Sequence, residues 1–167
     1  MSPRGAAVAE ALVGSWSLAS YLTRSTDGTI GHPLGDDAVG LLLYSPDGHM
    51  SGHLMRNGRE PFQEPRLEPV SRSGTDDEVR RAFNDIFGYG GTYTVDEKQS
   101  EVHHHLEVCV LPGWAGRTLS RSVEFADDGE ALLLTSGVRV VDGVRQRAEL
   151  RWRRVGRHAR ATHEDRG

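Results

Sequence analysis

The chain has 167 residues, of which 37% are hydrophobic, and its formal net charge at pH 7 is -4. This length predicts a single soluble globular domain, and no stretch approaches the roughly 18 consecutive apolar residues of a membrane-spanning helix. The single cysteine, Cys109, excludes an internal disulfide framework and a cysteine-rich zinc site. Because the first residues lack the apolar stretch of a secretory signal, we expect a cytoplasmic protein with no membrane partner.

The first part of the chain predicts a flexible segment, residues 1–11, followed by three strands. Alternation of polar and apolar residues indicates strands over 14–22, 39–45 and 49–56. Pro46-Asp47-Gly48, between the second and third strands, is typical of a tight turn, so these two strands are expected to form a hairpin. Residues 57–72 contain three prolines and many charges, which predicts an irregular loop.

An amphipathic helix is predicted over residues 75–87, between the third and fourth strands. Thr75 and Glu78 have the spacing of a capping box, which satisfies free backbone N–H groups at a helix start. Apolar residues then recur at helical spacing, at Val79, Ala82, Phe83, Ile86 and Phe87. We expect Gly88 to end the helix, the run Gly88–Gly91 to be a linker, and the apolar stripe to pack against the sheet.

Five more strands are predicted after the helix, over 91–96, 102–111, 117–125, 131–136 and 144–155. Short turns join them, whereas parallel pairing would require long crossovers, so antiparallel order is expected. A long meander avoids exposed edges by closing on itself. The sequence therefore predicts a mainly β protein: a closed eight-stranded antiparallel barrel that can hold one small ligand. Its domain covers residues 12–155, and residues 156–167 are expected to form a disordered tail.

The end of the chain is basic. Residues 145–167 contain eight arginines and three acidic residues, whereas the rest of the chain is acidic. A basic segment can bind nucleic acid. Four of these arginines lie within a strand-like alternation, however, and no base-stacking motif accompanies them. We therefore interpret them as a solvated strand face and predict no nucleic-acid partner.

Seven segments, taken in order, resemble the lipocalin-like domain family, a branch of the calycin barrels. They are Leu12–Trp16, Pro33–Gly35, Gly40–Ser51, Gly91–Asp96, His104–Glu107, Pro112–Gly116 and Leu150–Trp152. The resemblance implies a closed antiparallel barrel with an internal pocket, in which Trp16 closes one end beneath a late arginine, Arg154 or Arg153. It implies no single activity, although some members of such families cyclise polyketides in natural-product pathways.

Three consecutive histidines form the most prominent polar cluster. Since neighbouring side chains of a strand point to opposite faces, His104 is predicted to share the inward apolar face with Val102, Leu106, Val108 and Val110. A titratable ring in an apolar interior is a candidate acid, base or hydrogen-bond donor. The alternative is a core histidine satisfied by a neighbouring hydroxyl.

The two flanking histidines, His103 and His105, fall on the opposite, polar face with Glu101 and Glu107. Two histidines and a glutamate on one face could bind a metal ion. Solvated outward side chains are the interpretation we favour, and we predict no metal site.

Two arginines are candidates for the barrel interior. One face of the third strand carries Met50, Gly52, Leu54 and Arg56, and Gly52 would leave space inside a barrel. In the sixth strand, Arg121 alternates with Leu119, Val123 and Phe125. A buried arginine requires an anionic partner, which is either a carboxylate or enolate of a ligand or an acidic residue of the chain.

No nucleotide-binding or hydrolase motif is present, so no cofactor is predicted. A rigid apolar cavity that orients a flexible polyene would suit a cofactor-independent cyclase or pericyclase acting on a hydrophobic, polyketide-like intermediate. The alternative is a carrier that binds a hydrophobic small molecule without turnover, and a homodimer is left open.

The predicted catalytic residues are His104, Tyr44 and Arg121. The predicted ligand-binding residues are Trp114, Tyr93, Tyr21, Met50, Leu54 and Arg56.

Overall fold

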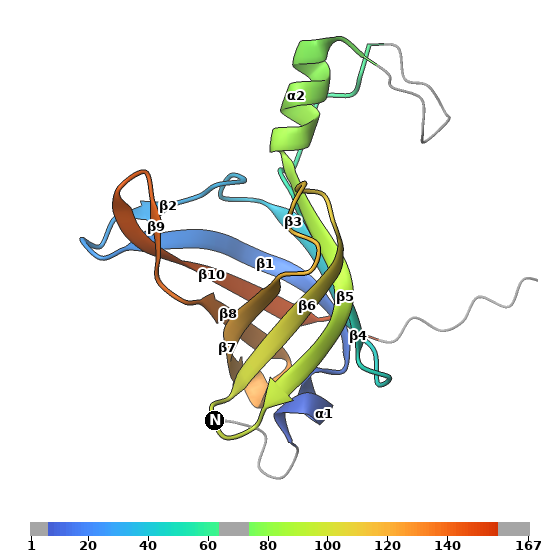
Figure 1. Ribbon diagram of the computed structural model, residues 1–167, viewed down its shortest axis with the longest axis vertical. Coiled ribbons are helices and arrows are strands. Elements are labelled where there is room, and N and C mark those ends of the chain that lie inside the picture. Colours follow the sequence, from blue (N-terminus) through green and yellow to red (C-terminus); the bar gives the residue numbers. More distant parts are fainter. Residues whose placement is uncertain (1–6, 64–73, 157–167) are drawn as a thin grey trace, which may run out of the picture.

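The computed structural model describes residues 7–63 and 74–156, most of which form a β-barrel (Figure 1). Residues 1–6 of the expected flexible segment, residues 64–72 of the expected loop and residues 157–167 of the expected tail lie outside the described residues.

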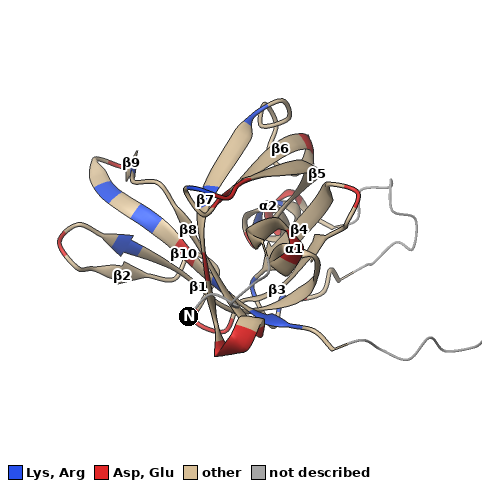
Figure 2. Ribbon diagram, turned by 90° about the horizontal axis from the view of Figure 1, so that it is seen from below, with Lys and Arg blue, Asp and Glu red and all other residues tan. Residues whose placement is uncertain are grey.

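Eight antiparallel strands form the barrel: β1 (Gly14–Ser25), β3 (Val39–Tyr44), β4 (His49–Met55), β5 (Ile86–Asp96), β6 (Glu101–Cys109), β7 (Thr118–Ala126), β8 (Ala131–Ser136) and β10 (Val144–Arg154). Each pairs with the next, and β10 returns to pair with β1, with Trp16 opposite Arg154. The short strands β2 (Ile30–Gly31) and β9 (Arg139–Val141) pair with β1 and β10 and extend to one side of the ring (Figure 2). The predicted closed eight-stranded barrel is confirmed.

Alternation along the strands fills the interior as the sequence predicts. In β7, Leu119, Arg121, Val123 and Phe125 are buried and their neighbours are exposed. In β4, Met50, Gly52 and Leu54 are buried in the same way. Removing these apolar side chains from water is the main favourable contribution to folding.

The alternation changes in β6, where the prediction for one valine is wrong. Gly90 pairs with Val108 and Gly91 pairs with Leu106, so Glu107 is an extra residue, a β-bulge. A one-residue shift directs the following side chains to the other face. Val108, predicted to point inward, is therefore 66% exposed, and Cys109 packs against the core instead.

Helix α2 (Asp76–Asn84) begins where the sequence predicts and ends earlier. The Glu78 N–H donates to Thr75 Oγ1 over 3.4 Å, and the Thr75 N–H donates to Glu78 Oε2 over 2.7 Å, which completes the capping box. Residues 86–87, expected on the helix, belong to β5, because their backbone pairs with the end of β4. The short strand β2 was not predicted, so the helix lies between β4 and β5, which are the third and fourth strands of the prediction.

Two further expectations about this region are wrong. The run Gly88–Gly91 is part of β5 and not a linker; a Cβ on Gly88 would lie 2.5 Å from the His53 ring, so the glycine makes room for that ring. The apolar stripe of α2 does not pack against the sheet, because the helix projects beyond one end of the barrel (Figure 1). Val79 is 37% exposed and Phe83 is 43% exposed.

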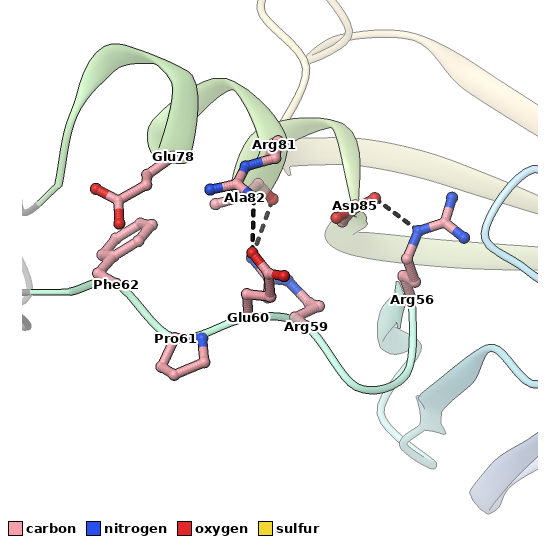
Figure 3. Close-up of a pocket in the computed structure, with 9 residues that line it drawn as sticks. All are labelled: Arg56, Arg59, Glu60, Pro61, Phe62, Glu78, Arg81, Ala82 and Asp85. Atoms are coloured by element: carbon pink, nitrogen blue, oxygen red, sulfur yellow. Dashed lines mark hydrogen bonds and ion pairs between the residues drawn. The ribbon is translucent and has the colours of Figure 1, made fainter.

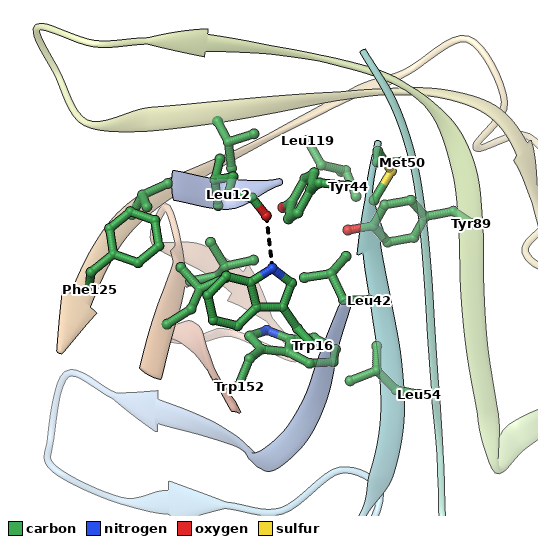
Figure 4. Close-up of a cluster of buried hydrophobic side chains, with 14 of the residues drawn as sticks. Leu12, Trp16, Leu42, Tyr44, Met50, Leu54, Tyr89, Leu119, Phe125 and Trp152 are labelled. Atoms are coloured by element: carbon green, nitrogen blue, oxygen red, sulfur yellow. Dashed lines mark hydrogen bonds between the residues drawn. The ribbon is translucent and has the colours of Figure 1, made fainter. Parts of the chain in front are cut away.

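The opposite end of the barrel is closed by a short helix, α1 (Val8–Leu12), which occupies part of the segment 1–11 that was expected to be flexible. The Trp16 indole N–H donates to the Leu12 carbonyl over 2.9 Å, and Phe125 packs beside the indole (Figure 4). The Arg154 guanidinium lies 4.1 Å from the centroid of the Trp16 ring. The tryptophan–arginine pair implied by the resemblance is therefore present. No helix within residues 7–63 and 74–156 is long and apolar enough to cross a membrane.

Candidate ligand-binding cavity

A cavity of about 490 Å³ occupies the half of the barrel away from α1. Its walls come from inward-facing positions of the strands, among them Leu42, Leu54, Leu134, Leu150 and Trp152. Small-molecule sites typically enclose about 300–1,000 Å³ and combine apolar walls with a few polar groups. The cavity therefore has the size and lining of a small-molecule site.

Aromatic side chains surround the mouth of the cavity. Phe83 comes from α2, Phe87 from the start of β5, and Trp114 from the loop after β6. The Trp114 and Phe87 rings meet edge to face with their centroids 5.8 Å apart. The Trp114 ring also contacts Arg117, whose guanidinium carbon lies 5.8 Å from the ring centroid. Trp114 is therefore positioned by packing, at a place where a ligand entering the barrel would contact it.

His104 lies inside the barrel and is 1% exposed. Its Nε2 atom lies 2.7 Å from the Tyr44 hydroxyl, and its Nδ1 atom lies 2.9 Å from the Tyr89 hydroxyl. Burial is the largest of the effects that lower the pKa of His104 from 6.5 to about 3, and the nearby positive charge of Arg121 contributes in the same direction. The imidazole is therefore neutral near pH 7, with one N–H donor and one acceptor nitrogen.

The two tyrosines bonded to His104 are also neutral. Burial raises the pKa of Tyr44 well above its ordinary value of 10.0, and burial raises the pKa of Tyr89 in the same direction. Tyr44, Tyr89 and His104 thus form a buried hydrogen-bonded chain of three neutral groups. Of the three, Tyr89 and His104 line the cavity, whereas Tyr44 lies behind them.

Arg121 lines the cavity on β7 and is 8% exposed. Its Nη1 group donates to the Ser120 carbonyl over 2.9 Å. Within residues 7–63 and 74–156, no carboxylate lies within 4.0 Å of its guanidinium. Burial lowers the pKa of Arg121, yet an arginine stays protonated in proteins. The sequence left two anionic partners open for Arg121, a ligand or an acidic residue of the chain. Among the described residues, no acidic side chain pairs with it.

The structure brings only some of the predicted ligand-binding residues to the cavity. Tyr21, Leu54 and Trp114 line it. Met50 is buried outside the lining, and Tyr93 lies behind Tyr44 with its hydroxyl donating to the Ser45 carbonyl over 2.9 Å.

Arg56 does not enter the barrel, contrary to the prediction. Its Nε group bonds to Asp85 Oδ1 over 2.8 Å at the base of α2, because β4 ends at Met55 and the chain turns away. It lines a separate hollow of about 460 Å³ between α2 and the segment after β4 (Figure 3). There Arg81 pairs with Glu60 over 2.7 Å, and Arg59 donates to the Ala82 carbonyl over 3.0 Å. These contacts tie the segment to the helix.

Tyr89 is a cavity-lining residue, bonded to His104, that sequence reasoning missed. The sequence predicts a linker at this position, since Gly88, Gly90 and Gly91 surround Tyr89. The signal that could have identified it is the alternation Phe87, Tyr89, Gly91, which continues the period of two from the strand that follows. The glycines hid this pattern because they lack side chains.

The two outer histidines are satisfied by hydroxyl groups on neighbouring strands. His103 Nδ1 lies 2.8 Å from Ser120 Oγ, and His105 lies 3.0 Å from both Thr94 Oγ1 and Thr118 Oγ1. Within the described ranges, no group of three or more histidine, cysteine, aspartate or glutamate side chains is placed to hold a metal ion.

An antiparallel barrel that is plugged at one end by a tryptophan–arginine pair and hollow at the other is a calycin-type barrel. The chain belongs to the lipocalin-like domain family, whose model matches residues 13–155. It is also 32% identical over 116 residues to the 4'-hydroxy-3'-methoxypropiophenone carrier protein of Aspergillus oryzae (strain ATCC 42149 / RIB 40). That match covers 65% of this chain and 98% of the relative.

Proposed function

We propose that this protein binds a hydrophobic small molecule inside the barrel and carries it without converting it. The observation that carries this proposal is the cavity of about 490 Å³, whose walls are mostly apolar and which is also lined by the hydrogen-bonded Tyr89–His104 pair and by the buried Arg121. A ligand there would leave water over most of its apolar surface. Its affinity would come mainly from buried apolar surface, and its orientation from the polar groups.

The relative from Aspergillus oryzae supports the carrier role, since it is named for carrying an aryl ketone. Such a ligand has a flat aromatic body and a small number of oxygen atoms. The cavity offers matching contacts: aromatic edges at Phe87 and Trp114, and hydrogen-bonding groups at Tyr89, His104 and Arg121.

A cofactor-independent cyclase is the second candidate, and one arrangement favours it. The Tyr89–His104–Tyr44 chain and the Arg121 guanidinium place fixed donors at the cavity wall. Donors of this kind can stabilise negative charge that develops on a conjugated carbonyl during ring closure. The carrier and the cyclase would use the same cavity and differ only in whether the ligand leaves changed.

Titration calorimetry with 4'-hydroxy-3'-methoxypropiophenone tests the proposal. We expect the wild-type protein to bind the ketone, and Gly52→Leu, which fills the cavity wall, to abolish binding. Ser51→Leu, on the outer face of the same strand, is the matched control and should bind normally. Binding that survives Gly52→Leu in a folded protein would contradict a site inside the barrel.

Chromatography and mass spectrometry of the ketone and of a linear conjugated polyene ketone, after incubation with the protein, distinguish the two roles. Unchanged recovery of both compounds supports the carrier. Conversion of the polyene to a cyclic isomer of the same mass, lost on Gly52→Leu, would replace the carrier with the cyclase.

A further inference from the structure

The charge around the cavity is opposite to the charge of the whole chain. The chain carries -4, yet the cavity is lined by Arg121, Arg139 and Arg147, and by no aspartate or glutamate among residues 7–63 and 74–156. Arg147 is paired with Glu149 over 3.3 Å, whereas neither of the other two has a carboxylate partner in the described part of the chain. The cavity therefore presents unneutralised positive charge to a ligand.

Arg121 is the more deeply buried of these two arginines. A guanidinium group has five N–H donors, and the one hydrogen bond that Arg121 makes to a described residue is that to the Ser120 carbonyl. A buried charge is unfavourable unless it is paired and hydrogen-bonded. The remaining donors face a cavity with no acidic side chain among the described residues, so a ligand that carries an anionic group would pair with them.

The hydrogen-bond donors and acceptors of Tyr44 and His104 also determine the direction in which the Tyr89 hydroxyl donates. Tyr44 is 2% exposed, and its hydroxyl has the His104 Nε2 atom as its partner among the described residues. If Nε2 carried the proton, the Tyr44 O–H would be buried without an acceptor, which is costly. Tyr44 therefore donates to Nε2, the ring proton is on Nδ1, and His104 donates to the Tyr89 oxygen. This leaves the Tyr89 O–H free to donate into the cavity.

The free hydroxyl and the unpaired guanidinium belong to one region of the wall. Arg121 lies opposite Val102, and Leu119 lies opposite His104, so Arg121 is the diagonal neighbour of His104 on the inward face. Tyr89 contacts the same histidine from β5, and the two ring centroids are 5.6 Å apart. The positive charge of Arg121 acts on Tyr89 and lowers its pKa against the larger effect of burial.

We propose that the ligand is an amphipathic organic anion whose oxyanion lies against the Arg121 guanidinium and accepts a second hydrogen bond from the Tyr89 hydroxyl. This inference rests on the proposed function, since it names the chemical class of the molecule that the cavity takes. The apolar body of the ligand fills the space between the strands, and its charged end lies at the arginine. Arg139 at the rim attracts the anion during entry, because it lines the cavity and is exposed.

Two fluorescent probes with the same skeleton test this inference. 8-Anilinonaphthalene-1-sulfonate carries an oxyanion, and N-phenyl-1-naphthylamine is the same molecule without the sulfonate. We expect the wild-type protein to bind both, the anion more tightly, and each to displace the other. Arg121→Met should weaken binding of the anion about ten- to hundredfold, as expected for the loss of a charged hydrogen bond, and leave binding of the neutral probe unchanged or tighter.

Arg151→Met is the control for net charge, since Arg151 is exposed on the outer face of β10, and it should leave both affinities unchanged. Tyr89→Phe should weaken only the anion, by a smaller factor, and it provides an independent test if Arg121→Met fails to fold. Equal effects of Arg121→Met on both probes, or none on the anion, would overturn the inference and leave the proposed function standing. Failure of the wild-type protein to bind either probe would instead contradict the proposed function.

Discussion

Two arginines at opposite ends of the barrel, one partly buried and one buried, show that a cation can either stabilise the fold or be available to a ligand. Arg154, at the closed end, donates to the carbonyls of Ala11, Val13 and Gly129 over 2.7, 3.0 and 3.2 Å and lies over the Trp16 ring. Arg121, at the hollow end, donates to the Ser120 carbonyl. Among the described residues, no aromatic ring stacks on its guanidinium and no carboxylate pairs with it. Arg154 therefore uses three of its five N–H donors within the protein, whereas Arg121 uses one on a described residue and has the others available for another molecule.

The same difference separates the two ends as a whole. The closed end is filled by Leu12, Trp16 and Phe125, whose burial stabilises the fold (Figure 4). The hollow end retains a cavity and a buried neutral histidine, both of which reduce stability relative to a filled apolar core. Near neutral pH, residues at the hollow end are therefore expected to affect binding more than folding, and the reverse is expected at the closed end.

The largest effect on the free energy of unfolding is expected on acidification, through His104 at the hollow end. The pKa of His104 is about 3 in the folded protein and 6.5 when unfolded, so between these values the unfolded state binds more protons. This contribution to stability is fully present above pH 6.5 and is lost as the pH falls toward 3. Between about pH 7 and pH 4 the wild type should lose roughly 3 kcal/mol more than His104→Gln, measured by urea unfolding. His103→Gln, on the outer face, is the control, and an equal slope in wild type and His104→Gln would contradict the assignment.

Smaller effects on the free energy of unfolding are expected from the two arginines, and their signs differ. Arg154→Met removes three hydrogen bonds and a cation–π contact, and it should lower the free energy of unfolding by about 2 kcal/mol. Arg121→Met removes an unpaired buried charge, and it should leave that free energy unchanged or raise it by about 1 kcal/mol. Both values come from urea unfolding at pH 7. If Arg121→Met destabilised the protein as much as Arg154→Met, the distinction between the two arginines would be lost.

The smallest effect on stability is expected at the mouth of the cavity. Trp114 is only half-buried, so Trp114→Ala should cost about 1 kcal/mol or less of unfolding free energy. It should nevertheless weaken binding of N-phenyl-1-naphthylamine about tenfold, because an aromatic contact at the entrance is lost. Thermal unfolding and fluorescence titration give the two numbers. A fall in stability without a fall in affinity would show that Trp114 only packs against Phe87.

Much of the fold could be predicted because strands carry a local signal. Alternation identified the eight strands of the barrel, and the capping box at Thr75 located the start of α2. The end of α2 could not be found in this way. The stripe Val79–Phe87 has helical spacing throughout, but pairing with β4, a partner distant in the sequence, draws its last residues into β5.

The site was less predictable, because it depends on pairs of residues far apart in the chain. The sequence by itself predicted that His104 faces inward and made Arg121 a candidate for the interior, since the side of a strand follows from counting residues. Only the tertiary structure decided that Tyr44 and Tyr89 bond to the two nitrogens of His104, and that no described acidic side chain reaches Arg121. Alternation specifies a direction within one strand, whereas a hydrogen bond or an ion pair depends on the register and closure of the whole barrel.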